Sequence, residues 1–232
     1  MKKSLNTGRE KKEKMPIRVL YHCCALNHWE SVVRDQCAKI LFSGLYDATD
    51  AIHCVCVGPE ARRCGGLLQN FGFKFKVEAC VPEDLSGERI TLRHIPSVVK
   101  PEDCVLYIHT KGVTKIPPSE CVYWWNLYME YFLIRHHRQC VDLLATSDVV
   151  GLDYYPQSLP HFSGNFWWAR GDYLLSLPPP DLEPGKDRYQ NTETWVCGGA
   201  TDKKPRLAQI AHSRNDHYTA ALYAYRYVDA EP

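Results

Sequence analysis

Short apolar runs alternate with amphipathic segments along the first half of the chain. The run 17–22 is β-branched and aromatic, which is typical of a buried strand. Asn27, with Glu30 three positions later, is expected to cap a helix whose apolar residues recur at helical spacing until Gly44. The same succession repeats, with strands predicted at 51–57, 73–78 and 104–108 and helices at 61–68 and 88–99.

The second half of the chain is richer in aromatic residues. A break at Pro117-Pro118 and a capping Ser119 precede a long helix that is apolar almost all round. We interpret it as a central packed helix, with a ligand platform or a subunit interface as alternatives. Strands are predicted at 148–152, 165–169 and 207–211, and helices at 172–177 and around 188–195.

This order of elements predicts an α/β fold of one domain. Strands separated by short helices favour a mostly parallel, Rossmann-like sheet with right-handed crossovers and helices on its faces. Residues 16–232 are predicted to form that domain behind a basic tail at 1–15. The chain has 232 residues, which suits a single domain of this class.

Charge is concentrated in the tail. The first fourteen residues contain six Lys or Arg and two Glu, which leaves 22 basic and 25 acidic residues, a net charge of −3, for the rest. A nucleic-acid partner is therefore not expected, because phosphate binding requires clustered positive charge on the folded body. No apolar run is long enough to span a membrane, and no secretion signal is evident, so we expect a soluble, cytoplasmic protein.

Eleven cysteines are present, an odd number that includes the adjacent pair Cys23-Cys24 and the Cys54-x-Cys56 spacing within apolar runs. These spacings suit neither a disulfide framework nor the Cys-x-x-Cys pairs of common zinc sites. We interpret them as buried free thiols that act as small hydrophobic residues in a reducing compartment.

Several catalytic signatures are absent, among them the dinucleotide fingerprint, the Walker A loop, the Gly-x-Ser-x-Gly elbow and His-Glu-x-x-His. Polar residues remain where predicted strands end. In open α/β sheets ligands bind at the carboxyl ends of the strands. The block His109-Thr110-Lys111-Gly112, directly after the strand 104–108, is therefore well placed for function.

Five segments together resemble small glycosyltransferases of the GT-A fold. They are YIHTKG (107–112) with the aromatic helix after it, DVVGLD (148–153), HFSGNFWWA (161–169), YLLSL (173–177), and Arg188 with Glu193 and Trp195. The similarity spans roughly residues 17–217 and is greatest to the compact glycosyltransferases of large algal viruses, with a more distant likeness to rhamnan-synthesis glycosyltransferases. It implies a nucleotide-binding half at about 16–112 and an acceptor half at about 113–232.

The resemblance also implies a donor site, with one departure. The corresponding GT-A strand typically ends in Asp-x-Asp, which holds a divalent metal on the donor diphosphate, whereas this chain has His109-Thr110-Lys111 there. These residues lack the hard oxygen ligands that Mg²⁺ requires. We expect Lys111 to offset the leaving-group charge instead, and Gly112 to let the backbone approach the phosphates. The alternative is that Lys111 is a solvated loop residue.

Two carboxylates are candidates for the catalytic base. Glu193 lies 82 residues after Lys111, a separation like that between the metal motif and the acceptor-side acid in GT-A chains. Asp153 is the second candidate, and Glu193 could instead pair with Arg188. No cofactor is expected to be required; were a metal needed, Asp153, His212 and His217 would be its candidate ligands.

The acceptor site is expected around a turn at Ser163-Gly164-Asn165. Trp167 and Trp168 must point to opposite sides of a strand, so one is expected to face the sugar and the other the core, unless both are buried. Trp195 is the third aromatic candidate for this site.

The function expected from these features is transfer of a sugar from a nucleoside-diphosphate donor to a glycan or other hydroxyl acceptor. Two alternatives stay open at this stage. One is a non-catalytic carbohydrate-binding module on the same shell, and the other is a nucleic-acid-associated protein that acts through the tail.

Overall fold

A computed structural model of the protein describes residues 15–83, 87–157, 159–180, 188–198, 204–213 and 216–219, without the side chains of 188–191. Within these residues the strands are β1 (Ile17–Cys24), β2 (Thr49–Val57), β3 (Phe75–Val81), β4 (Cys104–His109), β5 (Val149–Leu152), β6 (Tyr154–Tyr155), β7 (His161–Phe162), β8 (Trp167–Arg170) and β9 (Leu207–Ala211). The helices are α1 (Trp29–Phe42), α2 (Leu45–Ala48), α3 (Ala61–Gln69), α4 (Arg89–Leu92), α5 (Ile95–Val98), α6 (Glu120–Glu130), the π-helix η1 (Tyr131–Arg135), α7 (His137–Leu143), α8 (Gly171–Ser176) and α9 (Arg188–Gly198).

Seven of the described strands form one sheet in the order β3-β2-β1-β4-β8-β5-β9. Strand β8 runs antiparallel to both β4 and β5, and the other neighbours pair in parallel. The short strands β6 and β7 form a separate two-stranded ribbon. The predicted α/β class with a mostly parallel sheet flanked by helices is therefore confirmed.

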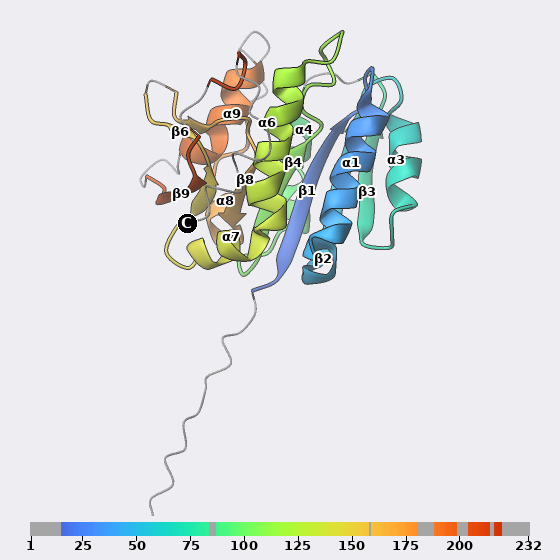
Figure 1. Ribbon diagram of the computed structural model, residues 1–232. Helices are drawn as coiled ribbons and strands as arrows, with labels where there is room; N and C mark the ends of the chain where they lie inside the picture. Colours follow the sequence, from blue (N-terminus) through green and yellow to red (C-terminus); the bar gives the residue numbers. More distant parts are fainter. Residues whose placement is uncertain are drawn as a thin grey trace, which may run out of the picture.

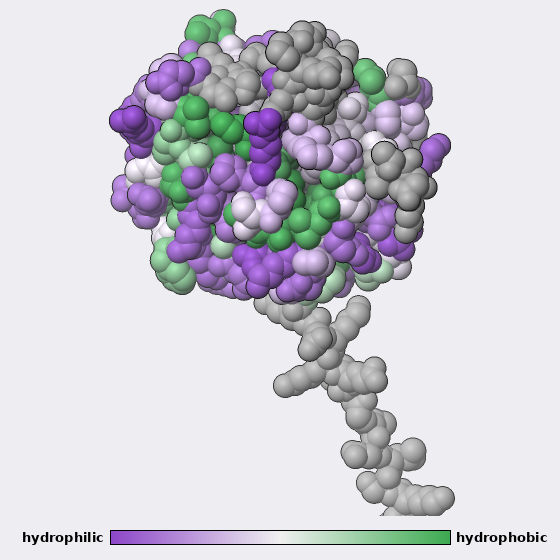
Figure 2. Space-filling view, turned by 180° about the vertical axis from the view of Figure 1, so that it is seen from behind, coloured by the Kyte–Doolittle hydropathy of each residue, from purple (hydrophilic) through white to green (hydrophobic). Residues whose placement is uncertain are grey.

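Helices cover both faces of the sheet (Figure 1). Helices α1, α3, α6 and α7 pack on one face, where Val19, Ile108 and Trp168 point into a large apolar cluster. On the opposite face the short helices α4, α5 and α8 cover a second cluster that contains Leu20 and Trp167. Figure 2 shows that on this second side apolar surface reaches solvent between hydrophilic residues.

The start of α1 differs from the prediction. The N-cap position is occupied by His28, which makes no side-chain capping bond. Asn27 adopts a φ of +51° and its Nδ2 donates to the backbone oxygen of Val113 at 2.6 Å, so it joins two loops instead of capping. Glu30, the second residue of the predicted cap, forms an ion pair with Arg34 at 2.8 Å, and no side chain caps the helix.

Two other predicted elements are altered. The helix expected over 88–99 is divided into α4 and α5, and Pro96 stands in the first turn of α5, where its missing N–H costs nothing but prevents continuation from the preceding turn. Strand β3 begins at Phe75, and Phe73 before it is 79% exposed. None of the helices in the described part of the chain combines the length and apolarity that crossing a membrane requires.

Candidate functional site

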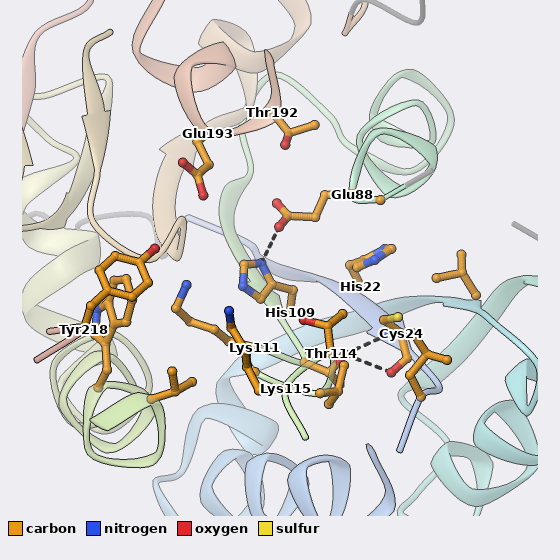
Figure 3. A pocket seen from close by; sticks show the side chains of 18 residues that line it. His22, Cys24, Glu88, His109, Lys111, Thr114, Lys115, Thr192, Glu193 and Tyr218 are labelled. Atoms are coloured by element: carbon orange, nitrogen blue, oxygen red, sulfur yellow. Dashed lines mark hydrogen bonds and ion pairs between the residues drawn. The ribbon is translucent and has the colours of Figure 1, made fainter. Parts of the chain in front are cut away.

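A cavity of about 460 Å³ lies at the carboxyl ends of β1, β2 and β4. Strand β1 has β2 on one side and β4 on the other, so the order of connection reverses between β1 and β4. At such a switch point the loops after adjacent strands diverge and leave a crevice. The cavity is lined from below by residues of the strand ends and from above by Thr192 and Glu193 of α9 (Figure 3).

The predicted block at the end of β4 lines this cavity. Thr110 accepts a hydrogen bond from the backbone N of Cys24 at 2.8 Å, which fixes the end of β4 against the end of β1. Gly112 has a φ of +89°, and a Cβ there would lie 2.6 Å from Val122 Cγ1. Glycine is therefore required both for the backbone turn and for the close approach of α6.

Lys111 extends into the cavity together with Lys115, on the side facing Glu193 and Glu88 (Figure 3). Its Nζ lies 3.9 Å from the centroid of the Trp125 ring, close enough for a cation–π interaction. Burial lowers the pKa of Lys111, while the negative charges of Glu193 and Glu88 oppose that shift. Lys111 is thus a half-buried cation that lies over the Trp125 ring and is favoured by the charges of Glu193 and Glu88. This differs from the alternative of a solvated loop residue without partners.

Glu193 lies opposite, at the boundary of two cavities. It lines the larger cavity and also a smaller one of about 150 Å³, and Trp125 and Tyr218 are likewise shared by both. Burial raises the pKa of Glu193, and Lys111 pulls it in the other direction. A carboxylate with raised basicity that faces two adjoining cavities can accept a proton from a molecule bound in either.

Glu88 is a site residue that the sequence analysis missed. Its Oε1 lies 3.0 Å from His109 Nδ1, and its Oε2 accepts hydrogen bonds from the Tyr107 hydroxyl at 2.9 Å and from the Asn165 amide. Burial alone would raise the pKa of Glu88, but the charge and hydrogen bond of His109 outweigh it and hold the pKa at about 2. Glu88 is therefore an ionised carboxylate that orients His109.

A second network of polar side chains binds the backbone at the end of β4. Gln36 accepts a hydrogen bond from the Tyr21 hydroxyl at 2.6 Å and donates to the backbone oxygen of His109 at 3.1 Å. It also donates to Glu130 at 3.0 Å, and the other oxygen of Glu130 binds Lys39. The backbone of His109 is thereby tied to α1 and α6.

The predicted turn at Ser163-Gly164-Asn165 is present, and Gly164 and Asn165 have φ values of +82° and +56°. Ser163 and Gly164 line the smaller cavity. Asn165 is 1% exposed, and its side chain binds Glu88 and accepts from Trp167 Nε1 at 3.2 Å. Assigning the Asn165 amide to a sugar is therefore wrong, because its hydrogen bonds are used within the protein.

The tryptophans predicted for the acceptor site lie elsewhere. Trp167 and Trp168 are 1% and 0% exposed, and each packs into the cluster on its own face of the sheet. Trp195 donates to the Pro178 oxygen at 2.8 Å and lines neither cavity. The expectation that one of these indoles faces a ligand is wrong, since helices cover both faces of β8. Trp125 provides the aromatic wall instead.

Asp153 lines neither cavity and is 1% exposed. Its carboxylate accepts from the Ser213 backbone N at 2.6 Å and lies 2.7 Å from His217 Nε2 and 3.0 Å from His212 Nδ1. Burial raises the pKa of Asp153, but these hydrogen bonds lower it below its ordinary value. His212 and His217 each contact Asp153, but the three residues named as metal ligands do not bring their ligand atoms within 4.8 Å of one another. Asp153 is also too enclosed to serve as the base.

His217, which Asp153 orients, stacks on the Trp125 ring with centroids 5.1 Å apart and lines the smaller cavity. Asp153 is therefore a positioning residue for the wall of that cavity. The side chain of Arg188, proposed as an alternative partner of Glu193, and the tail at 1–14 lie outside the described residues.

Comparison with known proteins identifies a family without a known activity. The chain matches the model of the family described as "Domain of unknown function (DUF8361)" over residues 47–220, and it belongs to that family. No curated protein matches it.

Two solved structures resemble the fold weakly. One is 4-diphosphocytidyl-2C-methyl-D-erythritol synthase from Anaerococcus prevotii DSM 20548, at 8% identity over 94% of this chain and 97% of that chain, with a TM-score of 0.49. The other is Rv0371C in complex with manganese from Mycobacterium tuberculosis H37Rv, at 12% identity over 92% of this chain and 97% of that chain, also with a TM-score of 0.49. Similarity at this level carries no conclusion about activity.

Proposed function

For this member of the DUF8361 family, we propose a glycosyltransferase activity that moves a sugar from a nucleoside-diphosphate donor to a hydroxyl of a glycan or other acceptor. The observation that carries the proposal is the larger cavity at the switch point, where Lys111 and Lys115 face the carboxylate of Glu193. Cations suit the diphosphate of a donor, and a carboxylate of raised basicity suits deprotonation of an acceptor hydroxyl.

The larger cavity has the volume of a small-molecule site, and the smaller one adjoins it. A volume of about 460 Å³ lies within the usual range of roughly 300–1,000 Å³ for small-molecule sites. The smaller cavity adjoins it through Glu193 and Trp125 and offers the Ser163 hydroxyl and the Tyr155 and His161 rings. We assign the donor to the larger cavity and the acceptor hydroxyl to the smaller one.

The proposed reaction is a displacement at the anomeric carbon of the donor. Glu193 accepts the proton of the acceptor hydroxyl while that oxygen forms a bond to the anomeric carbon. The bond from this carbon to the diphosphate oxygen breaks, and the electron pair leaves with the nucleoside diphosphate. Lys111 stabilises the charge that develops on the departing diphosphate. A single displacement of this kind inverts the anomeric configuration.

The residues at the end of β4 do not fit the divalent metal that a GT-A donor site usually holds. His109 Nδ1 is engaged by Glu88, Thr110 is engaged by Cys24, and Lys111 is itself a cation. A hard divalent ion prefers several oxygen ligands. We therefore propose transfer without a metal at this position. Full activity in excess EDTA is expected; complete loss of activity that Mn²⁺ restores would contradict this.

Binding of the donor can be tested by thermal shift with a panel of sugar nucleotides. A ligand that binds only the folded state raises Tm in proportion to RT ln(1 + [L]/Kd). We expect one sugar nucleotide to raise the Tm of the wild type and of Lys100→Met, an exposed control, but not that of Lys111→Met. Equal shifts in the two lysine variants would show that the donor does not occupy this cavity.

A further inference from the structure

Three buried thiols meet where β1, β2 and α3 pack together. The Sγ atoms of Cys23, Cys56 and Cys64 all lie within 4.8 Å of one another. All three side chains are 0% exposed. Among the described residues this is the one group of three or more His, Cys, Asp or Glu side chains whose ligand atoms lie this close. The three residues are separated by 33 and 8 positions, so no short motif marks the cluster in the sequence.

The register of the sheet and the close approach of a helix create this cluster. Cys23 and Cys56 are paired neighbours on the parallel strands β1 and β2, and Cys80 on β3 continues the row as the partner of Cys56. Helix α3, which packs on this face of the sheet, contributes Cys64 to the cluster. The next residue, Gly65, lets α3 approach the sheet, because a Cβ there would lie 2.9 Å from Cys80 Sγ.

The thiols interact with one another. Hydrogen bonds from Cys23 and Cys56 lower the pKa of Cys64, whereas burial raises that of Cys23.

We propose that Cys23, Cys56 and Cys64 form a binding site for a soft d¹⁰ metal ion, such as Cu(I) or Zn(II). Thiolates are the ligands that select these ions. In a tetrahedral site with zinc–sulfur bonds of about 2.3 Å the sulfur atoms are about 3.8 Å apart, so the cluster needs a contraction of at most about 1 Å. Each thiol that binds the ion releases its proton to solvent.

The two ions differ in the number of ligands that they require. Structural Zn(II) is almost always four-coordinate. The half-buried Cys80, the neighbour of Cys56 on β3, lies outside the group of three but would supply the fourth sulfur if its side chain moved towards the ion. Cu(I) is satisfied by the three buried sulfurs. Substitution of Cys80 therefore distinguishes the two ions without removing the shared site.

An ion bound by these cysteines would affect the larger cavity, because the strands that carry two of them end at its wall. Cys24 and Val57, which directly follow Cys23 and Cys56, both line the larger cavity. An ion bound by β1, β2 and α3 would fix these strand ends relative to one another. The inference does not depend on the proposed glycosyl transfer, because metal binding is measured without any sugar nucleotide.

The first test uses the full-length protein, reduced with a non-thiol reductant. Cu(I) or Zn(II) is supplied from a chromophoric chelator, and the ion taken by the protein is measured. We expect one ion per chain and a rise in Tm. Because the three thiols are already buried in the folded protein, alkylation is compared with and without the ion in partly denaturing urea, where Cys23, Cys56 and Cys64 should be labelled more slowly when the ion is bound, as read by mass spectrometry. Failure of both ions to leave the chelator, or protection of other cysteines only, would overturn the proposal.

The second test compares matched cysteine variants. Cys64→Ala should weaken binding of either ion by roughly 100-fold or more, since loss of a direct ligand should exceed the 10- to 100-fold cost typical of outer-shell changes. Cys140→Ala removes a buried thiol in α7, outside the cluster, and should retain the affinity. Cys80→Ser should weaken Zn(II) alone. Unchanged affinity in a folded Cys64→Ala protein would refute the site; if that variant does not fold, the wild-type alkylation pattern decides.

Discussion

Replacing Glu88 with Gln should remove a defined part of the acid sensitivity of folding. In the folded protein the pKa of Glu88 is about 2, against an ordinary value of 4.5, because the opposing effect of burial is outweighed by the charges of His109 and His22 and the hydrogen bonds of His109 and Tyr107. The depressed pKa means that this carboxylate contributes stability above pH 4.5 and loses it as the pH falls towards 2.

The magnitude follows from the shift. A pKa of about 2 in place of the ordinary 4.5 corresponds to about 3 kcal/mol at neutral pH, at 1.36 kcal/mol per pKa unit. The Glu88 side chain is 16% exposed, so solvent screening reduces this value only modestly. Between pH 6 and pH 3 the linkage relation gives a loss of about 2 kcal/mol from this group alone.

The assay is urea unfolding at pH 6 and at pH 3. The wild type should lose about 2 kcal/mol more stability over this interval than Glu88→Gln does, because Gln does not titrate. Glu102→Gln, at an exposed position, should behave as the wild type. If wild type and Glu88→Gln lost the same free energy of unfolding, the assignment of Glu88 as the ionised carboxylate that orients His109 would be wrong.

Three further outcomes are expected. Glu193→Gln should lower kcat by roughly 10²- to 10⁴-fold while donor binding, followed by thermal shift, is retained; an unchanged kcat would remove Glu193 as the base. In the wild type, kcat should rise with pH as Glu193 ionises at a pKa above its ordinary 4.5, and fall again as Lys111 loses its proton below its ordinary 10.5, so a flat pH profile would argue against both roles. Gly112→Ala should cost about 1–3 kcal/mol in denaturant unfolding, because of its φ of +89° and the contact with Val122, whereas Gly66→Ala, with open space around it in α3, should be neutral or gain about 0.5–1 kcal/mol.

The positions of most strands could be predicted from the sequence because local patterns of apolar residues mark them, whereas the order of the strands and the antiparallel direction of β8 could not. The strand at 104–109 and the block at 109–112 could be located from a buried run followed by polar residues. Their position beside the cavity then follows from the general behaviour of parallel sheets. The helix beginning after Ser119 was equally clear, since a cap and an apolar run mark it.

Features that depend on distant parts of the chain could not be predicted. Glu88 follows a polar loop and carries no motif, and only the fold brings it to His109 and Asn165. Alternation correctly placed Trp167 and Trp168 on opposite sides of β8, but it could not show that helices cover both sides. The cysteine cluster was missed for the same reason, because strand register and the approach of α3 assemble it.

The central claim is that the larger cavity binds a sugar nucleotide and that Glu193 activates the acceptor. The most direct test is release of nucleoside diphosphate, measured across a panel of sugar nucleotides with wild type, Glu193→Gln and Lys111→Met. We predict release from one donor by the wild type, even slowly to water, with both variants strongly reduced and Glu193→Gln still binding the donor. A wild type that binds sugars but releases no nucleoside diphosphate from any donor would contradict the account and identify a non-catalytic carbohydrate-binding module.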